Sequence, residues 1–372
     1  MSRYLNSLAV KNKVPLSGHF ELTQNCNFSC PMCYVHECKK KAELSAETWI
    51  SFGEQAKRAG TLFLLLTGGE PLLREDFEEI YTALSKMGFL ISVNTNGSLA
   101  KNYMTLFKKY PPFRVNVSLY AAQREAYKNF CSADKFDDVV GAIELFKNNK
   151  ISVRLNSVFT KENYSQAPEI IRFAKEHDLY LKSTAYTYPQ VRLKAPCGKN
   201  RVALSPRAAA ECETMADIAK LGDILYAAKA KRILLEDEDI SDSESFRKVH
   251  CRAGRSSFWL TWNGKMRACA MLPEPETEPL RVGFESAWRE LNEKMQLIRL
   301  PKECSVCKRR KSCPVCAAMC FCETGEFSKK PEYVCEFFEN LCRLSAEKMS
   351  DGALAVPSEE IKSDFEEDIY DC

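Results

Sequence analysis

The chain has 372 residues, a hydrophobic fraction of 45%, a charged fraction of 28% and a formal net charge of +3. These values are ordinary for a globular protein with one large domain and a smaller one, and so small a net charge creates no field aimed at nucleic acid or at a membrane. The sequence has no apolar run of 18 residues and no signal-type apolar segment before Leu16, so we expect a cytoplasmic protein without a nucleic-acid or membrane partner.

Strand-like and helix-like segments alternate through the first half of the chain. The expected strands are His19–Thr23, Thr61–Leu66, Leu90–Asn94, Arg114–Tyr120, Ile151–Phe159 and Leu179–Tyr186. Helical stretches between them include Arg74–Met87, Lys101–Lys109, Asp137–Asn149 and Pro168–His177. Six strand–helix units in series indicate a parallel sheet covered by helices, and right-handed connections curl such a sheet toward a barrel. The predicted fold class is α/β, a partial (β/α)6 TIM-like barrel followed by a small cysteine-rich domain.

Four of the predicted strands have one apolar and one polar face. In the fourth, Val115 and Val117 alternate with Asn116 and Ser118. Strands that are buried on both faces of a parallel sheet normally read as continuous apolar runs. We therefore expect the apolar faces to pack on the helices and the polar faces to line a wet cavity that holds a ligand. An antiparallel sheet with one solvated face is the alternative, and the intervening helices disfavour it.

The composition divides the chain into four regions. Residues 1–190 contain the predicted barrel, and residues 191–246 form a connecting segment with a helical stretch at Ser205–Ala228 and an acidic surface loop at Glu236–Ser245. Residues 247–345 are rich in cysteine. Residues 346–372 are acidic, and we expect this tail to be largely disordered.

Eighteen cysteines are unusual for a chain of this length, and most of them are clustered. Three lie between Cys26 and Cys33, and ten lie between Cys251 and Cys342. A chain of this size needs no disulfides to fold, and thiols stay free in a reducing compartment. Clustered cysteines then indicate ligands of metals or of iron–sulfur clusters.

The first cysteine group has the spacing CxxxCxxC and consists of Cys26, Cys30 and Cys33. Three thiolates bind three irons of one cubane and leave the fourth iron open. Zinc is the alternative, but a closed zinc site needs a fourth protein ligand, such as Cys38 or His36. A second motif, TGGEP at residues 67–71, follows the next predicted strand, and its paired glycines allow a ligand to approach the backbone closely.

Together these two motifs resemble the radical S-adenosylmethionine (SAM) superfamily over about residues 15–186. The resemblance implies a [4Fe–4S] cluster on Cys26, Cys30 and Cys33, whose open iron binds the amine and carboxylate of SAM. It also implies that the turn formed by Gly68, Gly69, Glu70 and Pro71 contacts the amino group of SAM. By position, the candidates for contacts to the SAM ribose and carboxylate are Asn94, Ser118, Arg154 and Asn156. Cluster and cofactor would supply a 5′-deoxyadenosyl radical that abstracts hydrogen from the substrate.

The C-terminal cysteines resemble the SPASM extension of radical SAM enzymes that modify peptides and proteins. The pattern comprises CxnGxxxxC from Cys251 to Cys269 and a CxxCx5CxxC block from Cys304 to Cys316, whose last spacing is one residue shorter than is usual. The resemblance implies two auxiliary [4Fe–4S] clusters, a distal one on Cys304, Cys307, Cys313 and Cys335 and a nearer one on Cys251, Cys269 and Cys316. Two zinc ribbons are the alternative, because CxxC spacing suits zinc equally well.

The nearer auxiliary cluster has no fourth ligand in this pattern, since residues 252–268 contain no cysteine. Cys320 follows Cys316 by four residues and reaches the same cluster if that segment is helical, in which case Cys322 points elsewhere. Otherwise one iron stays open and is able to bind a substrate thiolate. The sequence leaves both outcomes open.

Outside these motifs, Cys197 reads as an ordinary thiol, with hydrogen-atom donation as the alternative. Cys38, Cys131, Cys212 and Cys372 are also expected to be ordinary thiols. The basic run at residues 308–311 is expected to be a solvated face that counters cluster charge, with attraction of an acidic peptide leader as the alternative. His19 and Glu21 are expected to line the pocket or the core.

The sequence thus predicts a radical SAM enzyme, an oxidoreductase or maturase that acts anaerobically on a peptide or protein substrate. Thioether formation, carbon–carbon crosslinking and epimerisation all remain open, and flavodoxin or ferredoxin is the expected electron donor. An anaerobic sulfatase maturase that makes formylglycine is an alternative, although this chain has Ala270 where those enzymes typically place an acidic base. A non-catalytic iron–sulfur or zinc protein is the alternative from another class.

Overall fold

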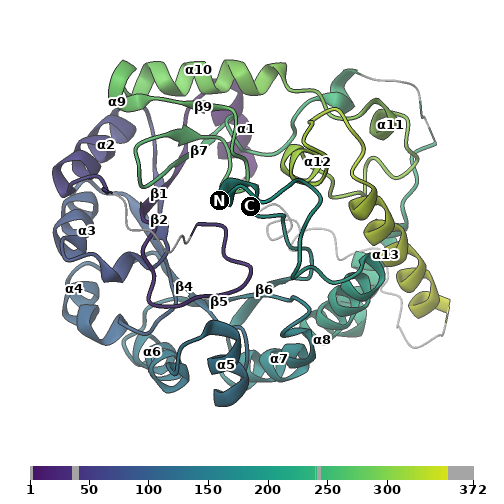
Figure 1. The fold of residues 1–372 in the computed structure, drawn as a ribbon, viewed down its shortest axis with the longest axis horizontal. Helices are drawn as coiled ribbons and strands as arrows, with labels where there is room; N and C mark the ends of the chain where they lie inside the picture. Colours follow the sequence, from purple (N-terminus) through teal and green to yellow (C-terminus); the bar gives the residue numbers. More distant parts are fainter. Residues whose placement is uncertain (1–2, 36–41, 239, 241–243, 351–372) are drawn as a thin grey trace.

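The structure is a computed structural model that describes residues 3–35, 42–238, 240 and 244–350. Its centre is a curved sheet of nine strands in the order β6-β5-β4-β3-β2-β1-β7-β8-β9 (Figure 1). The six parallel strands of the barrel are β1 (Ser17–Thr23), β2 (Phe63–Gly68), β3 (Leu90–Thr95), β4 (Arg114–Ser118), β5 (Val153–Val158) and β6 (Tyr180–Thr184). This arrangement confirms the predicted partial (β/α)6 barrel.

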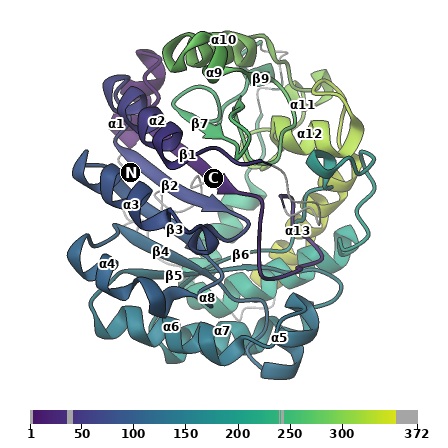
Figure 2. The same ribbon diagram turned by 60° about the vertical axis from the view of Figure 1, so that its left-hand side comes forward.

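Helices cover the outer face of this sheet (Figures 1 and 2). They are α2 (Ala46–Arg58), α3 (Phe77–Lys86), α4 (Met104–Lys109), α5 (Arg124–Cys131), α6 (Phe136–Asn148) and α7 (Ala167–Glu176), and α1 (Arg3–Lys11) precedes β1. Within the part of the chain that the structure describes, no helix is long and apolar enough to span a membrane.

The alternation along the strands decides which face meets the helices. Phe20 and Leu22 of β1 and Val115 and Val117 of β4 are buried in the core between sheet and helices. The polar residues between them lie on the opposite face, where Asn116 donates a hydrogen bond from Nδ2 to Asn94 Oδ1 over 2.8 Å. The expected polar inner face of the barrel is therefore present.

The cysteine-rich region shares this sheet instead of forming a sheet of its own. Strand β7 (Ser257–Leu260) lies parallel to β1, and β8 (Met266–Arg267) and β9 (Glu276–Thr277) continue it in antiparallel fashion. Gly18 of β1 has to be glycine, because an added Cβ would lie 2.4 Å from the ring of Phe258. Helices α9 (Pro279–Val282) and α10 (Phe284–Leu297) follow and complete this side of the sheet. The boundary predicted at residue 247 therefore does not separate two sheets.

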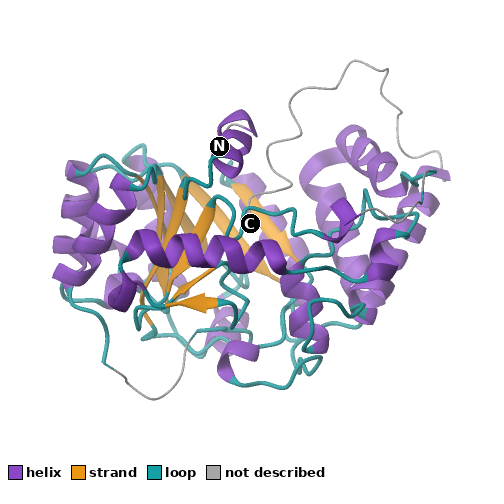
Figure 3. Ribbon diagram, turned by 90° about the horizontal axis from the view of Figure 1, so that it is seen from above, coloured by secondary structure: helices purple, strands orange, loops and turns teal. Residues whose placement is uncertain are grey.

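The last helices form a layer beside the open edge of the barrel (Figure 3). They are α8 (Pro206–Leu234), α11 (Lys302–Ser305), α12 (Ala317–Thr324) and α13 (Glu332–Ser350), and α13 packs along α8. Helix α8 bends at Gly222, where φ is +72°, and Lys229 of its second half hydrogen-bonds Asp217 of its first half. The predicted tail began at residue 346, but α13 continues through Ser350, so residues 346–350 are helical. Residues 351–372 lie outside the described residues.

We predicted a surface loop at Glu236–Ser245, but one residue of this acidic stretch is buried and binds the basic run at residues 308–311. Asp237 is buried and accepts hydrogen bonds from Arg310 over 2.5 Å and from Lys311 over 2.8 Å. These two donors hold the pKa of Asp237 below its usual value, the contact with Lys311 being the larger cause. Arg310 is only 5% exposed in its side chain, whereas Lys308 is exposed and the side chain of Lys311 is 60% exposed. The basic run at residues 308–311 is therefore a solvated face, as expected, except at Arg310.

Candidate functional site

The CxxxCxxC loop leaves the carboxyl end of β1, which is the end where ligands gather in barrels of this type. Cys26 Sγ accepts a hydrogen bond from the backbone N–H of Phe28 over 3.4 Å and lies 3.9 Å from the donating side-chain amide of Asn96. Burial raises the pKa of Cys26 to about 12, and the nearby charges of Cys30 and Cys33 add to the rise. The three sulfurs therefore lie close enough to interact. A thiol of this kind loses its proton when a metal binds.

Cys30 has a second sulfur beside it. A hydrogen bond with Cys131, at the end of α5, is the largest cause that raises the pKa of Cys30, and burial is the second. The backbone N–H of Ser29 also donates to the carbonyl of Cys131 over 2.9 Å. Helix α5 thus fixes the middle of the cysteine loop. Of the other cysteines that we expected to be ordinary thiols, Cys38 and Cys372 lie outside the described residues.

The glycine motif holds the loop that leads to Cys26. The N–H groups of Gly69 and Glu70 donate to the carbonyls of Thr23 and Asn25, each over 2.8 Å. A Cβ on Gly68 would lie 2.4 Å from Thr23 O, and a Cβ on Gly69 would lie 2.3 Å from Asn25 O. The close approach that requires these glycines is therefore the neighbouring backbone. A role of their N–H groups toward SAM stays a prediction.

The buried carboxylate of Glu70 stabilises the turn by accepting hydrogen bonds. Its Oε1 accepts from the N–H of Leu72 over 3.0 Å and from the hydroxyl of Thr95 over 2.9 Å, and its Oε2 accepts from the N–H of Asn96 over 2.6 Å. Burial raises the pKa of Glu70 to about 7 in spite of these bonds. Pro71 opens a short 3-10 helix, Pro71–Leu73, as its position after the turn suggested. The carboxylate of Glu70 thus ties β2 to β3 at the mouth of the barrel.

The polar residues expected in the lumen lie on three adjacent strands. Asn116 pairs in register with Asn94 and Arg154, and Ser118 pairs with Asn156. Asn116 Oδ1 and Asn156 Oδ1 are buried and accept no hydrogen bond from any residue that the structure describes. The guanidinium of Arg154 lies 4.5 Å from the ring centroid of Tyr180. Two unsatisfied acceptors beside a cation suit a ligand with hydroxyl or amino donors, and the ribose and amine of SAM offer both.

A buried ion pair that the sequence reasoning missed lies on the lumen side of β1. Arg192, in the loop after β6, donates to both carboxylate oxygens of Glu21 over 2.8 and 2.9 Å, and the indole N–H of Trp259 donates to Glu21 over 2.8 Å. Arg192 also donates to the carbonyl of Ala270 over 2.9 Å. Its guanidinium lies 5.5 Å from the ring centroid of Tyr34. No local pattern in the sequence marks Arg192.

The loop after β6 also holds the first cysteine loop. The side-chain amide of Gln190 donates to the carbonyl of Cys33 over 2.6 Å and to that of Pro31 over 3.1 Å. Burial raises the pKa of Tyr34, and the charges of both Cys33 and Cys269 contribute to the rise. Tyr34 is half-buried, and its ring lies edge-on to that of Trp259 in β7, with the centroids 6.5 Å apart, so it contacts both the CxxxCxxC loop and the cysteine-rich region.

The four cysteines predicted for the distal cluster come together. Burial raises the pKa values of Cys304 and Cys313 to about 12, and in both cases the charges of Cys307 and Cys335 contribute. Two of the four, Cys304 and Cys307, lie at and just after the short helix α11, and Cys335 lies in the first turn of α13. Their role as cluster ligands stays a prediction, but the fold provides the required set of four thiols.

Two buried cysteines of α12 lie near the other predicted cluster. Burial is the largest cause that raises the pKa of Cys320, followed by the charges of Cys304, from the distal set, and of Cys316. Burial is also the largest cause for the raised pKa of Cys322, followed by the charges of Cys269 and Cys316. Cys316 is the N-cap of α12, and its carbonyl accepts from the N–H of Cys320 over 3.0 Å, one helical turn further on. The sequence left closure by Cys320 and an open iron as equal outcomes, and the identity of the fourth ligand stays a prediction.

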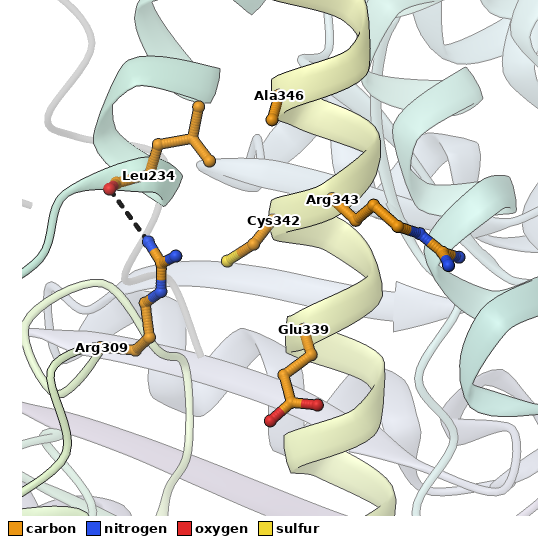
Figure 4. Close-up of a pocket in the computed structure, with 6 residues that line it drawn as sticks. All are labelled: Leu234, Arg309, Glu339, Cys342, Arg343 and Ala346. Atoms are coloured by element: carbon orange, nitrogen blue, oxygen red, sulfur yellow. Dashed lines mark hydrogen bonds between the residues drawn. The ribbon is translucent and has the colours of Figure 1, made fainter.

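Among the described residues, no three histidine, cysteine or acidic side chains gather tightly enough to hold a single metal ion. A cavity of about 280 Å³ lies between α8 and α13 (Figure 4). It is next to the loop of the distal cysteine set, since the backbone N–H of Arg309 donates to Cys307 Sγ over 3.4 Å. It is lined by Leu234, Arg309, Glu339, Cys342, Arg343 and Ala346. Arg309 donates to the carbonyl of Leu234 at its rim over 2.9 Å. None of the candidate ligand residues lines this cavity.

Comparison with known proteins agrees with the geometry of the barrel. The sequence profile described as Radical SAM superfamily matches residues 20–174. A protein of Sulfurisphaera tokodaii named probable GTP 3′,8-cyclase is 29% identical over 294 residues, which is 77% of this chain and 91% of that protein. The chain spans about half the length of seven further relatives with the same name.

Two solved structures share the fold over most of the chain. Streptococcus suis SuiB bound to the precursor peptide SuiA superposes with a TM-score of 0.64 and 18% identity, over 89% of this chain and 79% of SuiB. The protein anSMEcpe with bound S-adenosylmethionine superposes with a TM-score of 0.68 and 18% identity, over 91% of this chain and 99% of anSMEcpe. The chain therefore shares the fold of these two proteins over about nine tenths of its length.

Proposed function

Because residues 20–174 of this chain belong to the radical SAM superfamily, we propose that this radical SAM enzyme modifies a peptide or protein substrate. The observation that carries the proposal is the contact between the cysteine-rich region and the barrel. Arg192 joins the carbonyl of Ala270 to Glu21 of β1, and Tyr34 interacts with the charges of Cys33 and Cys269. A second redox centre beside Cys269 would thus lie next to the barrel mouth.

The residues present fit a first cluster with SAM on it. Cys26, Cys30 and Cys33 provide three thiols at the mouth, and Asn96 and Phe28 direct N–H groups at the sulfur of Cys26. Asn116 and Asn156 offer buried acceptors on the lumen face, beside the candidates Asn94, Ser118 and Arg154. When bound, the cluster and SAM supply the radical that removes hydrogen from the substrate. The chain's own part is to orient both and to exclude water.

The cysteine-rich region fits two auxiliary clusters. Cys304, Cys307, Cys313 and Cys335 would hold the distal one, and Cys251, Cys269 and Cys316 would contribute to the nearer one. A substrate that forms a thioether or a carbon–carbon crosslink loses two electrons, one with the hydrogen atom that it gives up and a second to an acceptor nearby. The nearer auxiliary cluster would be that acceptor, and flavodoxin or ferredoxin would supply the electron that starts each turnover.

Two alternatives to this proposal are a nucleotide substrate and formylglycine formation. The relatives of this chain that align over its barrel carry the name GTP 3′,8-cyclase, so a nucleotide is the second candidate substrate. Formylglycine formation ranks lower, because the side chain that follows Cys269 is the methyl group of Ala270 and its carbonyl is occupied by Arg192. A peptide substrate is supported by the fold shared with SuiB and anSMEcpe over about nine tenths of the chain.

The test begins with SAM cleavage. Anaerobically reconstituted protein with SAM and dithionite should release 5′-deoxyadenosine, and the Cys30→Ala variant should not, although it keeps its auxiliary iron. Release of 5′-deoxyadenosine by Cys30→Ala would show that the cluster is assigned to the wrong cysteines. Protein that holds zinc and little iron would instead be a non-catalytic metal protein.

The substrate is tested in parallel reactions. One contains the short peptides encoded beside the gene, and the other contains GTP, each with SAM and reduced flavodoxin. A mass loss of two hydrogens in a peptide, or deuterium uptake at one residue in D2O, supports peptide modification. Consumption of GTP with no change in any peptide would overturn the proposal in favour of the nucleotide.

A further inference from the structure

The nearer auxiliary site contains a cysteine that the sequence pattern does not assign. We propose that Cys322 is the fourth ligand of the nearer auxiliary cluster, together with Cys251, Cys269 and Cys316, and that this cluster has no open iron. The inference rests on the proposed auxiliary clusters, but it concerns only the identity of one ligand. It therefore stands or falls separately from the nature of the substrate.

The two polar groups of one residue connect Cys322 to Cys269. The backbone N–H of Met271 donates to Cys269 Sγ over 3.5 Å, and the backbone carbonyl of Met271 accepts from Cys322 Sγ over 3.6 Å. The segment after β8 therefore contacts both sulfurs through the backbone of one residue. Cys322 is fully buried there, and its thiol points at the carbonyl of Met271 instead of at solvent.

Cys316 is the N-cap residue of α12, the helix that carries Cys322. Its sulfur is 3.8 Å from the hydroxyl of Tyr188, which follows β6. The charges of Cys269 and Cys316 both act on Cys322, which places the three sulfurs within one electrostatic neighbourhood. Two loops and one helix therefore bring three thiols together, although the residues lie in separate parts of the sequence.

The phase of α12 separates Cys322 from Cys320. Two residues along an α-helix turn the side-chain direction by about 200°, so the two cysteines leave α12 on nearly opposite sides. The charge of Cys316 contributes to the pKa of both cysteines, whereas that of Cys269 is among the causes given for Cys322. Cys322 is also the cysteine of α12 whose thiol contacts Met271, the residue that bonds Cys269.

The segment that contains Cys251 lies near Cys269, at the start of β7. Trp259 pairs with Arg267 in the antiparallel ladder, so Cys269, two residues further on, lies beside the beginning of β7. The N–H of Ser257 donates to the carbonyl of Arg252 over 3.0 Å, which keeps the segment at Cys251 close to that strand. A Cβ on Gly254 would lie 3.2 Å from Ala268, so the two segments touch.

Cys197 is the remaining thiol in this neighbourhood, and its position is peripheral. The N–H of Gly198 donates to the carbonyl of Cys322 over 2.9 Å, which places Cys197 behind the backbone of α12. Its sulfur lies 3.7 Å from where a Cβ on Gly325 would be, at the far end of the same helix. These contacts link Cys197 to α12, whereas the thiol of Cys322 contacts Met271, the residue that bonds Cys269, so Cys322 is the better candidate.

Four protein thiolates have a functional consequence. An open iron would bind a substrate thiolate directly, whereas a fully ligated cluster exchanges only electrons. The nearer cluster would then accept the second electron from a substrate that is held elsewhere, in the lumen of the barrel. Cysteine in the substrate would not be required for binding at this site.

The test uses the full-length chain with Cys26, Cys30 and Cys33 all replaced by Ala, so that only auxiliary clusters contribute. After anaerobic reconstitution with 57Fe, Cys322→Ala, Cys320→Ala and Cys197→Ala are compared in this background. Each sample is reduced and mixed with 13C-cyanide, and the 13C hyperfine coupling and the iron content are measured. The parent protein should hold about eight irons from two cubanes and should show no 13C coupling.

The expected result is that Cys322→Ala alone shows 13C coupling to a reduced cluster, or alone falls to about four irons per chain while the distal cluster remains. Coupling in the parent protein would overturn the proposal, because the nearer cluster would then have an open iron. Cyanide binding that appears with Cys320→Ala or Cys197→Ala would also overturn it, as would a Cys322→Ala protein that matches the parent in both measurements.

Discussion

Arg192 and Glu21 form a two-point ion pair, with nitrogen–oxygen distances of 2.8 and 2.9 Å, across the inner face of the barrel. The side chain of Glu21 is fully buried and that of Arg192 is 6% exposed. The charge of Glu21 is the largest of the causes that raise the pKa of Arg192 against its desolvation. Since Arg192 also bonds Ala270, this pair connects the first strand, the loop after the last barrel strand and the cysteine-rich region.

Breaking this ion pair from one side should destabilise the protein strongly. Arg192→Met leaves the buried carboxylate of Glu21 with only the Trp259 N–H, and we expect a loss of about 3–5 kcal/mol in unfolding free energy. The double variant Glu21→Gln with Arg192→Met should recover most of that loss, because no charge stays unpaired. Anaerobic urea unfolding, followed by tryptophan fluorescence, measures both. Equal stability of Arg192→Met and the parent would show that the pair is not formed.

Gly69→Ala should disrupt the first cysteine loop, because its Cβ would lie 2.3 Å from the carbonyl oxygen of Asn25. We expect the reconstituted protein to lose about four irons per chain and its SAM cleavage, while auxiliary iron remains. Gly141→Ala is the matched control, since no heavy atom lies within 4 Å of that position in α6. This variant should keep its iron and gain about 0.5–1 kcal/mol of stability. Similar iron contents in the two variants would contradict the close packing of the glycine turn against the cysteine loop.

His19 should make the stability depend on pH. Burial lowers its pKa from 6.5 to about 4, and its ring stacks on Trp259 at 5.0 Å and hydrogen-bonds the carbonyl of Phe258. Below pH 6.5 His19 is therefore protonated in the unfolded chain but stays neutral in the folded chain. The free energy of unfolding consequently decreases as the pH falls. Between pH 7.5 and 5.5 this contribution amounts to roughly 1 kcal/mol. Urea unfolding at both pH values should show a smaller difference in unfolding free energy for His19→Gln than for the parent. Equal differences for the two proteins would contradict a neutral, buried His19.

Asp237→Ala should weaken the distal cluster. Asp237 is 3% exposed in its side chain and neutralises Arg310, which lies in the loop between Cys307 and Cys313. Without Asp237 the buried guanidinium of Arg310 loses this ion pair, and we expect the loop to open and about four irons per chain to be lost. Glu236→Ala is the control, because Glu236 pairs with Arg309 at a more exposed position, 48% exposed in its side chain. Iron analysis of both variants decides, and equal iron contents would contradict the anchoring role of Asp237.

Local signals in the sequence were enough to predict the barrel. The alternation in β4 of buried Val115 and Val117 with polar Asn116 and Ser118 reflects a sheet with helices on one face and a ligand cavity on the other. The CxxxCxxC and GGEP motifs lie one strand apart at the carboxyl ends of β1 and β2, where the register of a parallel sheet has to bring them together. For the glycines, however, the sequence could not tell that the close neighbour is the backbone of Thr23 and Asn25.

The sequence by itself determined the alternation of strands and helices and the first cysteine group, because each depends on residues close together in the chain. The four cysteines of the distal set follow from the resemblance and stay a prediction. Only the tertiary structure decided that β7 pairs with β1, that Arg192 meets Glu21 across 171 positions, and that Cys322 and Cys269 both contact the backbone of Met271. Those relationships depend on long-range packing and on where α12 begins. A shift of the helix start by one residue turns every following side chain by about 100°, and cysteine spacing alone carries no information about that start.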